Sequence, residues 1–273
     1  MNSYKDKTAL VTGASSGIGL AIANSLARRG AHLILTARST NKLNEVAKGI
    51  RDGGNRAHIF SGDLSQAGAA EQLYKEVLAA NLKVDLLVNN AGYGRWGDFT
   101  EFGRDDYAQM IQLNITSLTE LCHLFIPAMV SRSGGGVINI GSTASFIPVP
   151  FASVYSASKA YVLLFSDALR YEYADHDVRI MTICPGATDS NFRAVAAMNS
   201  NALQTLIAKM EELGDVGASC EEVAEQGLDA FLQNKVYVVT GKGNKKFTLL
   251  PRILSRARVL NMVGDTFRKR LGK

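Results

Sequence analysis

The chain has 273 residues, of which 47% are hydrophobic and 20% are charged, the balance of a soluble globular protein rather than a disordered one. Its three cysteines, Cys122, Cys184 and Cys220, form no CxxC pair and no metal-ligand spacing. This pattern argues against a disulfide framework, predicts no metal site and favours a reducing compartment. No apolar signal region precedes the first strand-like run, so we expect a cytoplasmic protein.

The net charge of +5 is unevenly distributed along the chain. Residues 242–273 contain ten Lys or Arg and one acidic residue, Asp265, and therefore carry a net charge of +9. Residues 1–241 carry a net charge of −4. Because the basic character belongs to the C-terminal tail alone, we predict no nucleic-acid partner for the protein.

Short apolar runs rich in β-branched residues alternate with longer segments of helical periodicity. Strands are predicted at Thr8–Val11, His32–Thr36, Arg56–Ser61, Asp85–Val88, Gly136–Ile140, Arg179–Ile183 and Val236–Val239. Helices are predicted at residues 17–30, 40–52, 66–80, 104–131, 154–175 and 220–233. This alternation predicts an α/β fold with a doubly wound parallel sheet, a Rossmann fold. We expect one catalytic domain over residues 1–241 and a basic C-terminal extension over residues 242–273.

A glycine-rich turn follows the first predicted strand, with Gly13, Gly17 and Gly19 at the spacing GxxxGxG. Small residues there let the backbone approach a pyrophosphate, and the N-terminus of the next helix favours negative charge. A plain tight turn is one alternative. A serine hydrolase is another, because the turn also matches GxSxG, with Ser15 as nucleophile and His176 downstream. A nucleophile elbow normally follows several strands, so the hydrolase is the weaker interpretation.

The second predicted strand ends at Ala37 and Arg38, where a site selective for NAD usually has an acidic residue on the ribose 2′-hydroxyl. An arginine can pair with a 2′-phosphate through two hydrogen bonds. We therefore expect NADP(H) to be favoured over NAD(H). The alternative is that Arg38 only caps a solvated loop.

Three polar residues follow later strands. Ser142 comes directly after the fifth predicted strand, and Tyr155 and Lys159, four residues apart, share one face of a helix. A cation beside a phenol is expected to lower the phenol pKa from about 10, so that the tyrosine can donate and accept a proton. A serine hydroxyl can hydrogen-bond a substrate oxygen that develops charge.

In this order, the motifs resemble those of the short-chain dehydrogenase/reductase family. The matching segments are TGASSGIG (12–19), NNAG (89–92), Asn114, Ser142, YSASK (155–159) and Pro185-Gly186. The resemblance covers roughly residues 5–240 and implies four catalytic residues. Tyr155 would be the general acid in reduction and the general base in oxidation, and Ser142 would position the substrate. Lys159 would lower the pKa of Tyr155 and hold the nicotinamide ribose, while Asn114 would hold a relay water.

The resemblance also implies the cofactor-binding residues. With Arg38, they are Gly13, Ser15, Ser16, Gly17, Ile18, Gly19, Asp63, Leu64, Asn90, Ala91, Gly92, Tyr155, Lys159, Pro185, Gly186 and Thr188. Two departures from the family pattern stand out. Ser190 replaces a frequent threonine, and the segment after the last predicted strand is unusually basic. We expect a homodimer or a homotetramer, and the basic segment argues against the tetramer.

Apolar segments flank the predicted catalytic residues. They are residues 146–154, residues 93–97 with the single Trp96, and a lid over residues 189–215 with Phe192, Met198, Leu203, Leu206 and Met210. We expect a mostly apolar pocket for an apolar ketone, an aldehyde or a 3-oxoacyl group. Packing of these residues on the body or on a partner subunit is the alternative. Arg95 and Arg193 are interpreted as solvated side chains rather than substrate contacts.

In the C-terminal extension, Ile253, Ala257, Leu260, Phe267 and Leu271 fall at helical spacing among basic residues. We expect this stripe to pack on the body or on a partner subunit, with an interruption at residues 264–265. Peripheral membrane binding and disorder are the alternatives.

The leading hypothesis is an oxidoreductase that transfers a hydride between NADP(H) and a carbonyl or alcohol substrate. The rival is a nucleotide-binding sensor or scaffold of the same fold that has no turnover. Family members of that kind usually lack the Tyr or the Lys. Both Tyr155 and Lys159 are present, which favours the enzyme.

Overall fold

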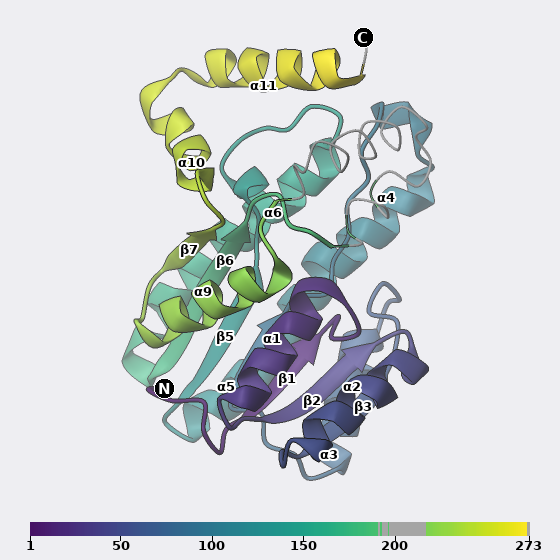
Figure 1. Ribbon diagram of the computed structural model, residues 1–273, viewed down its shortest axis with the longest axis vertical. Helices are drawn as coiled ribbons and strands as arrows, with labels where there is room; N and C mark the ends of the chain where they lie inside the picture. The colour runs from purple at the N-terminus through teal and green to yellow at the C-terminus, as the bar shows by residue number, and fades with distance from the viewer. Residues whose placement is uncertain (191, 193–195, 197–216, 272–273) are drawn as a thin grey trace.

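The described residues form one parallel sheet of seven strands in the order β3-β2-β1-β4-β5-β6-β7 (Figure 1). The strands are β1 Thr8–Thr12, β2 His32–Ala37, β3 Ala57–Ser61, β4 Leu86–Asn89, β5 Gly135–Ile140, β6 Val178–Pro185 and β7 Tyr237–Thr240. The strand order reverses at β1, which confirms the doubly wound sheet predicted from the sequence. In such a sheet, ligands bind beyond the carboxyl ends of the strands.

The computed structural model describes residues 1–190, 192, 196 and 217–271. Most of the predicted lid therefore lies outside the described residues. This applies to Arg193, Met198, Leu203, Leu206 and Met210.

Helices cover both faces of the sheet. They are α1 Gly17–Arg28, α2 Thr40–Asp52, α3 Ala69–Ala79, α4 Arg104–Ile111, α5 Leu118–Ser131, α6 Ser153–Glu172, α9 Cys220–Leu232, α10 Asn244–Ile253 and α11 Arg256–Leu271. Helices α1, α2 and α9 pack on one face, and α3, α5 and α6 pack on the other. Figure 1 shows α10 and α11 beyond the end of β7, clear of the sheet.

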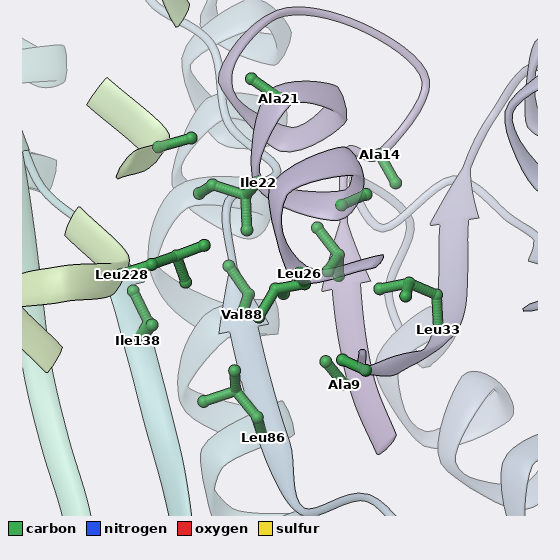
Figure 2. Close-up of a cluster of buried hydrophobic side chains, with 14 of the residues drawn as sticks. Ala9, Ala14, Ala21, Ile22, Leu26, Leu33, Leu86, Val88, Ile138 and Leu228 are labelled. Atoms are coloured by element: carbon green, nitrogen blue, oxygen red, sulfur yellow. The ribbon is translucent and has the colours of Figure 1, made fainter. Parts of the chain in front are cut away.

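The core under α1 sets the position of the glycine-rich turn. Ile22 and Leu26, one helical turn apart, point from α1 onto Val88 and other strand residues, and Leu228 of α9 closes the side of this cluster (Figure 2). Burial of one such side chain stabilises the fold by about 1.5–3 kcal/mol. The N-terminus of α1 is thus held over the carboxyl end of β1.

Residues 104–131 were predicted as one helix, and the structure interrupts it with a π-helical turn over Gln112–Ser117. The run Arg104–Ser131 is long and apolar enough to cross a membrane by length and composition alone. Within this run, α5 packs against α3 and the sheet. The core helix of a soluble protein can be equally long and apolar. The π-helical turn is relevant to function, because such turns are frequent at functional sites.

The predicted interruption at residues 264–265 is wrong. α11 continues through Gly264, whose position lies against the Pro150 ring, and the break falls instead at Leu254, in extended conformation between α10 and α11. A glycine inside a helix costs roughly 1 kcal/mol. Val259 and Val263, both buried against the body, offset that cost by packing.

Candidate active site

The glycine-rich turn is held in place by the neighbouring strand. Gly13 has a φ of +65°, and a Cβ at this position would lie 2.8 Å from Asn90 Nδ2. Asn90 Nδ2 donates to the Thr12 carbonyl at 2.9 Å, and the amides of Asn90 and Ala91 donate to Thr12 Oγ1 at 2.9 Å. Asn90 and Ala91 therefore brace the turn, and Gly13 is required for its conformation and for the close approach of Asn90.

The N-terminus of α1 leaves its amides available to a ligand. Ser16 is the N-cap residue, but its side chain makes no capping hydrogen bond, and the first turn carries no acidic residue. Ser15 precedes it, and Gly17, Ile18 and Gly19 form the first turn. Ser190 lies over this turn, with its Cβ 3.6 Å from the Cβ that Gly17 would carry. An uncapped N-terminus behind a tight glycine turn fits a pyrophosphate.

Arg38 and Asp63 come together beyond β2 and β3. Partial burial raises the pKa of Asp63, but hydrogen bonds from Ser65 at 2.7 and 3.0 Å and the charge of Arg38 outweigh it, so the pKa lies below its usual value. Arg38 is exposed. Leu64 is buried beside them, and its carbonyl accepts from Ser117 Oγ at 2.6 Å. The arrangement offers an exposed cation and a carboxylate at the edge predicted to hold adenosine.

Ser142 and Tyr155 are two of the four residues predicted to be catalytic. Ser142 follows β5 directly and begins a short 3₁₀ turn, with its Oγ accepting from the Ala144 amide at 3.1 Å. Tyr155 lies in the first turn of α6 and is buried. Burial raises the pKa of Tyr155 to about 12, and a hydrogen bond with the Ser142 side chain opposes that rise. The phenol therefore carries its proton at neutral pH.

Lys159, the third residue predicted to be catalytic, lies one helical turn after Tyr155 in α6. Its Nζ donates to the Ile140 carbonyl at 2.8 Å and lies 5.9 Å from the centre of the Tyr155 ring. Burial lowers the pKa of Lys159 to about 8. In the protein chain alone the net shift of the Tyr155 pKa is upward, opposite to the expected lowering, because burial is its largest cause. The Lys159 ammonium donates to the Ile140 carbonyl.

Asn114 lies in the π-helical turn and bridges two elements of the site. It is buried, accepts from the Tyr93 amide at 3.1 Å and donates to the Tyr93 carbonyl at 2.9 Å and to Ser158 Oγ at 3.1 Å. Ser158 donates to the Tyr155 carbonyl at 2.7 Å. A Cβ at Gly92 would lie 3.0 Å from Asn114 Oδ1 and 3.5 Å from Lys159 Nζ. The four predicted catalytic residues are thus brought together.

The end of β6 approaches the C-terminal extension. β6 ends at Pro185, and Thr188 Oγ1 donates to the Gly186 carbonyl at 3.1 Å. A Cβ at Gly186 would collide with the side chain of Asn244, the first residue of α10. Asn244 Nδ2 also donates to the Thr240 carbonyl at 2.7 Å. The segment predicted to follow the nicotinamide is therefore backed by α10.

An apolar wall surrounds Tyr155. Its buried members are Met110, Val149, Ala152 and Tyr155, packed with Tyr93, Trp96, Tyr107, Ala144, Ile147, Val154, Phe192 and Phe267. The Phe192 ring is 5.4 Å from the Tyr155 ring, and Phe267 of α11 meets Trp96 edge-on at 5.8 Å. α11 therefore covers this wall from the far end of the chain.

Two residues differ from what the sequence predicted. Phe146 packs on Tyr237, with ring centres 5.4 Å apart, in a separate cluster next to β7. Arg95 is not solvated: its guanidinium lies 5.0 Å from the Tyr93 ring centre and pairs with Asp106 at 3.2 Å. Arg95 therefore braces the segment 93–97 rather than facing solvent.

The sequence interpretation missed three residues of this site. Ser145 Oγ accepts from the Ser142 amide at 3.1 Å and donates to the Lys159 carbonyl at 2.8 Å, and so ties the two catalytic elements together. Its spacing of three residues from Ser142, typical of a helix-capping pair, is a usable signal. No local signal identifies Asn244 or Phe267, because each meets its partner across a long stretch of chain.

The serine hydrolase alternative does not fit the topology. Ser15 follows the carboxyl end of β1, whereas His176 precedes the amino end of β6. The strands are parallel, so these residues lie at opposite edges of the sheet. No triad can form between them.

Comparisons with known proteins agree with this fold and site. A family model described as short chain dehydrogenase matches residues 7–201. A fatty acyl-CoA reductase from Acinetobacter baylyi is 40% identical over 181 residues, 66% of this chain and 61% of that protein. The ketoacyl reductase HetN from Nostoc sp. is 33% identical over 186 residues, 68% of this chain and 65% of that protein. The matches thus span less than two thirds of either relative.

A solved structure is similar over nearly the whole chain. The short-chain dehydrogenase from Sphingobium yanoikuyae in complex with NADPH has a TM-score of 0.76 and 28% identity, and the match covers 96% of this chain and 94% of that one. The family model alone spans well over half of the chain. The chain therefore belongs to the short-chain dehydrogenase/reductase family of oxidoreductases.

Proposed function

We propose that this protein is an NADP(H)-dependent reductase of an apolar ketone, an aldehyde or a 3-oxoacyl group. The observation that carries the proposal is the buried group at the carboxyl edge of the sheet. There the Ser142 hydroxyl contacts the Tyr155 phenol, and Lys159 and Asn114 are held beside them by backbone carbonyls and Ser158. A scaffold without turnover has no need of this arrangement.

In this proposal the chain's own residues handle the proton. Tyr155 donates its phenolic proton to the carbonyl oxygen, and the Ser142 hydroxyl hydrogen-bonds the same oxygen as its charge develops. The Lys159 ammonium stabilises the phenolate that remains, and a water held at Asn114 returns a proton from solvent. When bound, the nicotinamide supplies a hydride to the carbonyl carbon, or takes one from the alcohol in the reverse direction.

The preference for NADP(H) rests on Arg38. Its guanidinium is exposed at the end of β2, where a 2′-phosphate could form a bidentate pair. Gly13 and the uncapped amides of Gly17, Ile18 and Gly19 would hold the pyrophosphate. The NADPH in the Sphingobium structure supports this choice.

The substrate class rests on the apolar wall and on two relatives. Tyr155 is surrounded by Val149, Phe192 and other apolar side chains. The relatives are named as fatty acyl-CoA and ketoacyl reductases, and both names describe carbonyl groups on apolar chains. We further propose a catalytic domain over residues 1–241, an extension over residues 242–273, a homo-oligomer and a cytoplasmic location.

Titration of the purified chain with NADPH and NADH, followed by quenching of the single Trp96, tests the cofactor. NADPH consumption with a medium-chain 2-ketone, an aldehyde and a 3-oxoacyl thioester tests the reaction. We expect tighter NADPH binding and turnover of at least one apolar carbonyl. Binding without any turnover would favour the scaffold, and equal binding of both cofactors would remove Arg38 from the proposal.

A further inference from the structure

Helix α10 leaves most of its large apolar side chains exposed. Its one buried residue is Thr248, whereas Phe247, Leu249 and Ile253 are 55%, 45% and 77% exposed. A helix that packs only on its own protein shows the opposite pattern. The apolar side of α10 is therefore not explained by contacts with the rest of the chain.

This exposure continues into the first half of α11. Of the eleven large hydrophobic side chains exposed among the described residues, five lie within residues 247–262. We call these five the tail surface: Phe247, Leu249, Ile253, Leu260 and Met262. Val259 and Val263 of α11 are buried against the body, so α11 is anchored while the tail surface remains uncovered. A concentrated apolar patch of this kind marks an interaction surface.

The segment that carries the tail surface is positively charged. Residues 242–264 contain six Lys or Arg and no acidic residue. An open groove of about 610 Å³ at the base of α10 is lined by Lys235, Lys242, Lys245 and Lys246, with Asp229 at its wall. Asp229 is already paired with Arg29 at 2.6 Å. The surface therefore favours an anionic partner.

A second copy of the chain is a poor occupant. In a two-fold dimer the same surface lies on both subunits, so the cations of one tail would face those of the other. An anionic lipid surface satisfies both features, because apolar side chains enter the headgroup boundary while Lys and Arg meet lipid phosphates. We propose that the tail surface and its cations dock the protein onto a membrane that contains anionic lipids.

Co-sedimentation of the full chain with vesicles tests the charge. We expect binding to vesicles of phosphatidylcholine with phosphatidylglycerol, weak binding to phosphatidylcholine alone, and release at high salt. The triple variant Lys245→Gln/Lys246→Gln/Arg252→Gln should lower the partition coefficient roughly 100-fold. A control that removes the same charge elsewhere, Lys7→Gln/Lys48→Gln/Lys83→Gln, should retain most of the binding.

A second variant tests the apolar side chains. Phe247→Ser/Ile253→Ser should lower vesicle binding at least about tenfold, since each loses an inserted side chain. Leu78→Ser/Leu164→Ser changes residues of comparable exposure, 50% and 70%, on α3 and α6 and should bind as wild type does. All these positions are exposed, so circular dichroism should show an unchanged fold.

Three outcomes would overturn the proposal. One is equal sedimentation with neutral and anionic vesicles, or none with either. Another is an equal loss in the control variants. The last is a change of molar mass by light scattering in the Phe247→Ser/Ile253→Ser variant with vesicle binding unchanged, which would make the surface a contact between copies. None of these measurements depends on turnover, so they stand apart from the proposed activity.

Discussion

The catalytic edge of the sheet and the C-terminal helices meet at one site, but different forces hold them there. The buried side chains of Ser142, Lys159 and Asn114 hydrogen-bond backbone groups, and the backbone carbonyl of buried Tyr155 accepts from Ser158. α11 reaches the same site through apolar contacts, chiefly Phe267 on Trp96. Among the described residues, no ion pair joins α10 or α11 to the body.

The two kinds of contact suit different roles in the site. Buried hydrogen bonds are directional and leave a polar group costly to misplace, so they suit residues that must stay within proton-transfer distance. Apolar contacts are less directional, so packed side chains can shift or exchange partners. Such contacts suit a helix that only covers the site. We therefore expect mutations at the catalytic edge to change turnover and mutations in α11 to change substrate binding.

The largest effect expected is that of Tyr155→Phe. Removing the phenolic proton should lower kcat by about 10²–10⁴-fold and leave NADPH binding close to that of wild type. The matched control is Tyr161→Phe on the same helix, whose hydroxyl lies 2.9 Å from Thr119 Oγ1 and away from the site. NADPH consumption at 340 nm would measure both. Near-normal turnover of Tyr155→Phe would exclude this residue as the general acid.

The catalytic edge was predictable from the sequence because Ser142 lies just beyond a strand, Tyr155 and Lys159 share one face of the next helix, and the motifs resemble those of one family. Apolar runs locate the strand ends, and parallel strands bring their carboxyl ends together. The order of elements and the grouping of Ser142, Tyr155 and Lys159 were predicted for that reason. The pKa of Tyr155 was not, since spacing along a helix says nothing of desolvation or of the carbonyl that Lys159 meets.

The C-terminal extension could be predicted only in part. Helical periodicity indicated helices, but it does not say which side meets the body. The side of α10 that carries Phe247 and Ile253 is exposed, while Val259 of α11 is buried and Phe267 packs on the site wall. The contact of Phe267 with Trp96 joins residues from distant parts of the chain, and no local pattern encodes such a pair.

Arg38→Asp tests the role of the catalytic edge in choosing between NADPH and NADH. Loss of a charge-assisted bidentate pair, with a carboxylate in its place, should change the NADPH/NADH ratio of kcat/KM roughly 10- to 100-fold toward NADH. Lys48→Asp, an exposed cation on α2, is the control for charge alone. An unchanged ratio in Arg38→Asp would contradict a role in 2′-phosphate binding.

The pH dependence of the two directions should differ. Burial raises the pKa of Tyr155 to about 12, so the phenol is the acid that reduction needs at neutral pH. Oxidation needs the phenolate, and its rate should rise by up to about tenfold per pH unit below that pKa. Reduction should be flat below the Lys159 pKa of about 8 and decline as that ammonium is lost. Oxidation that slows with rising pH, in protein that remains folded, would contradict this assignment.

Phe267→Ala tests whether α11 acts only as a cover. The loss of an edge-on aromatic contact is worth about 0.5–1.5 kcal/mol, which predicts a rise of about two- to tenfold in KM for a bulky apolar substrate and little change in kcat. Phe247→Ala, an exposed residue of α10, is the control within the extension. A large fall in kcat with KM unchanged would contradict the role of α11 as a cover, because α11 would then take part in positioning the catalytic residues.

The smallest effect expected lies in the body, where α1 and α9 are joined by charge. Hydrogen bonds from Ser25 and Arg29 lower the pKa of Glu225 to about 2. A lowered pKa stabilises the fold fully above the unfolded value of 4.5, and the contribution is lost as pH falls through about 2.

The Glu225 side chain is 42% exposed, so solvent screening limits its contribution to less than about 1 kcal/mol. Glu225→Gln should therefore lower the Tm at neutral pH by about 2–4 °C at most, and by less near pH 3, whereas Glu221→Gln should not. Equal losses at both pH values would mean that Glu225 holds α9 through packing, as α11 is held, and the two regions would then differ less than their contacts indicate.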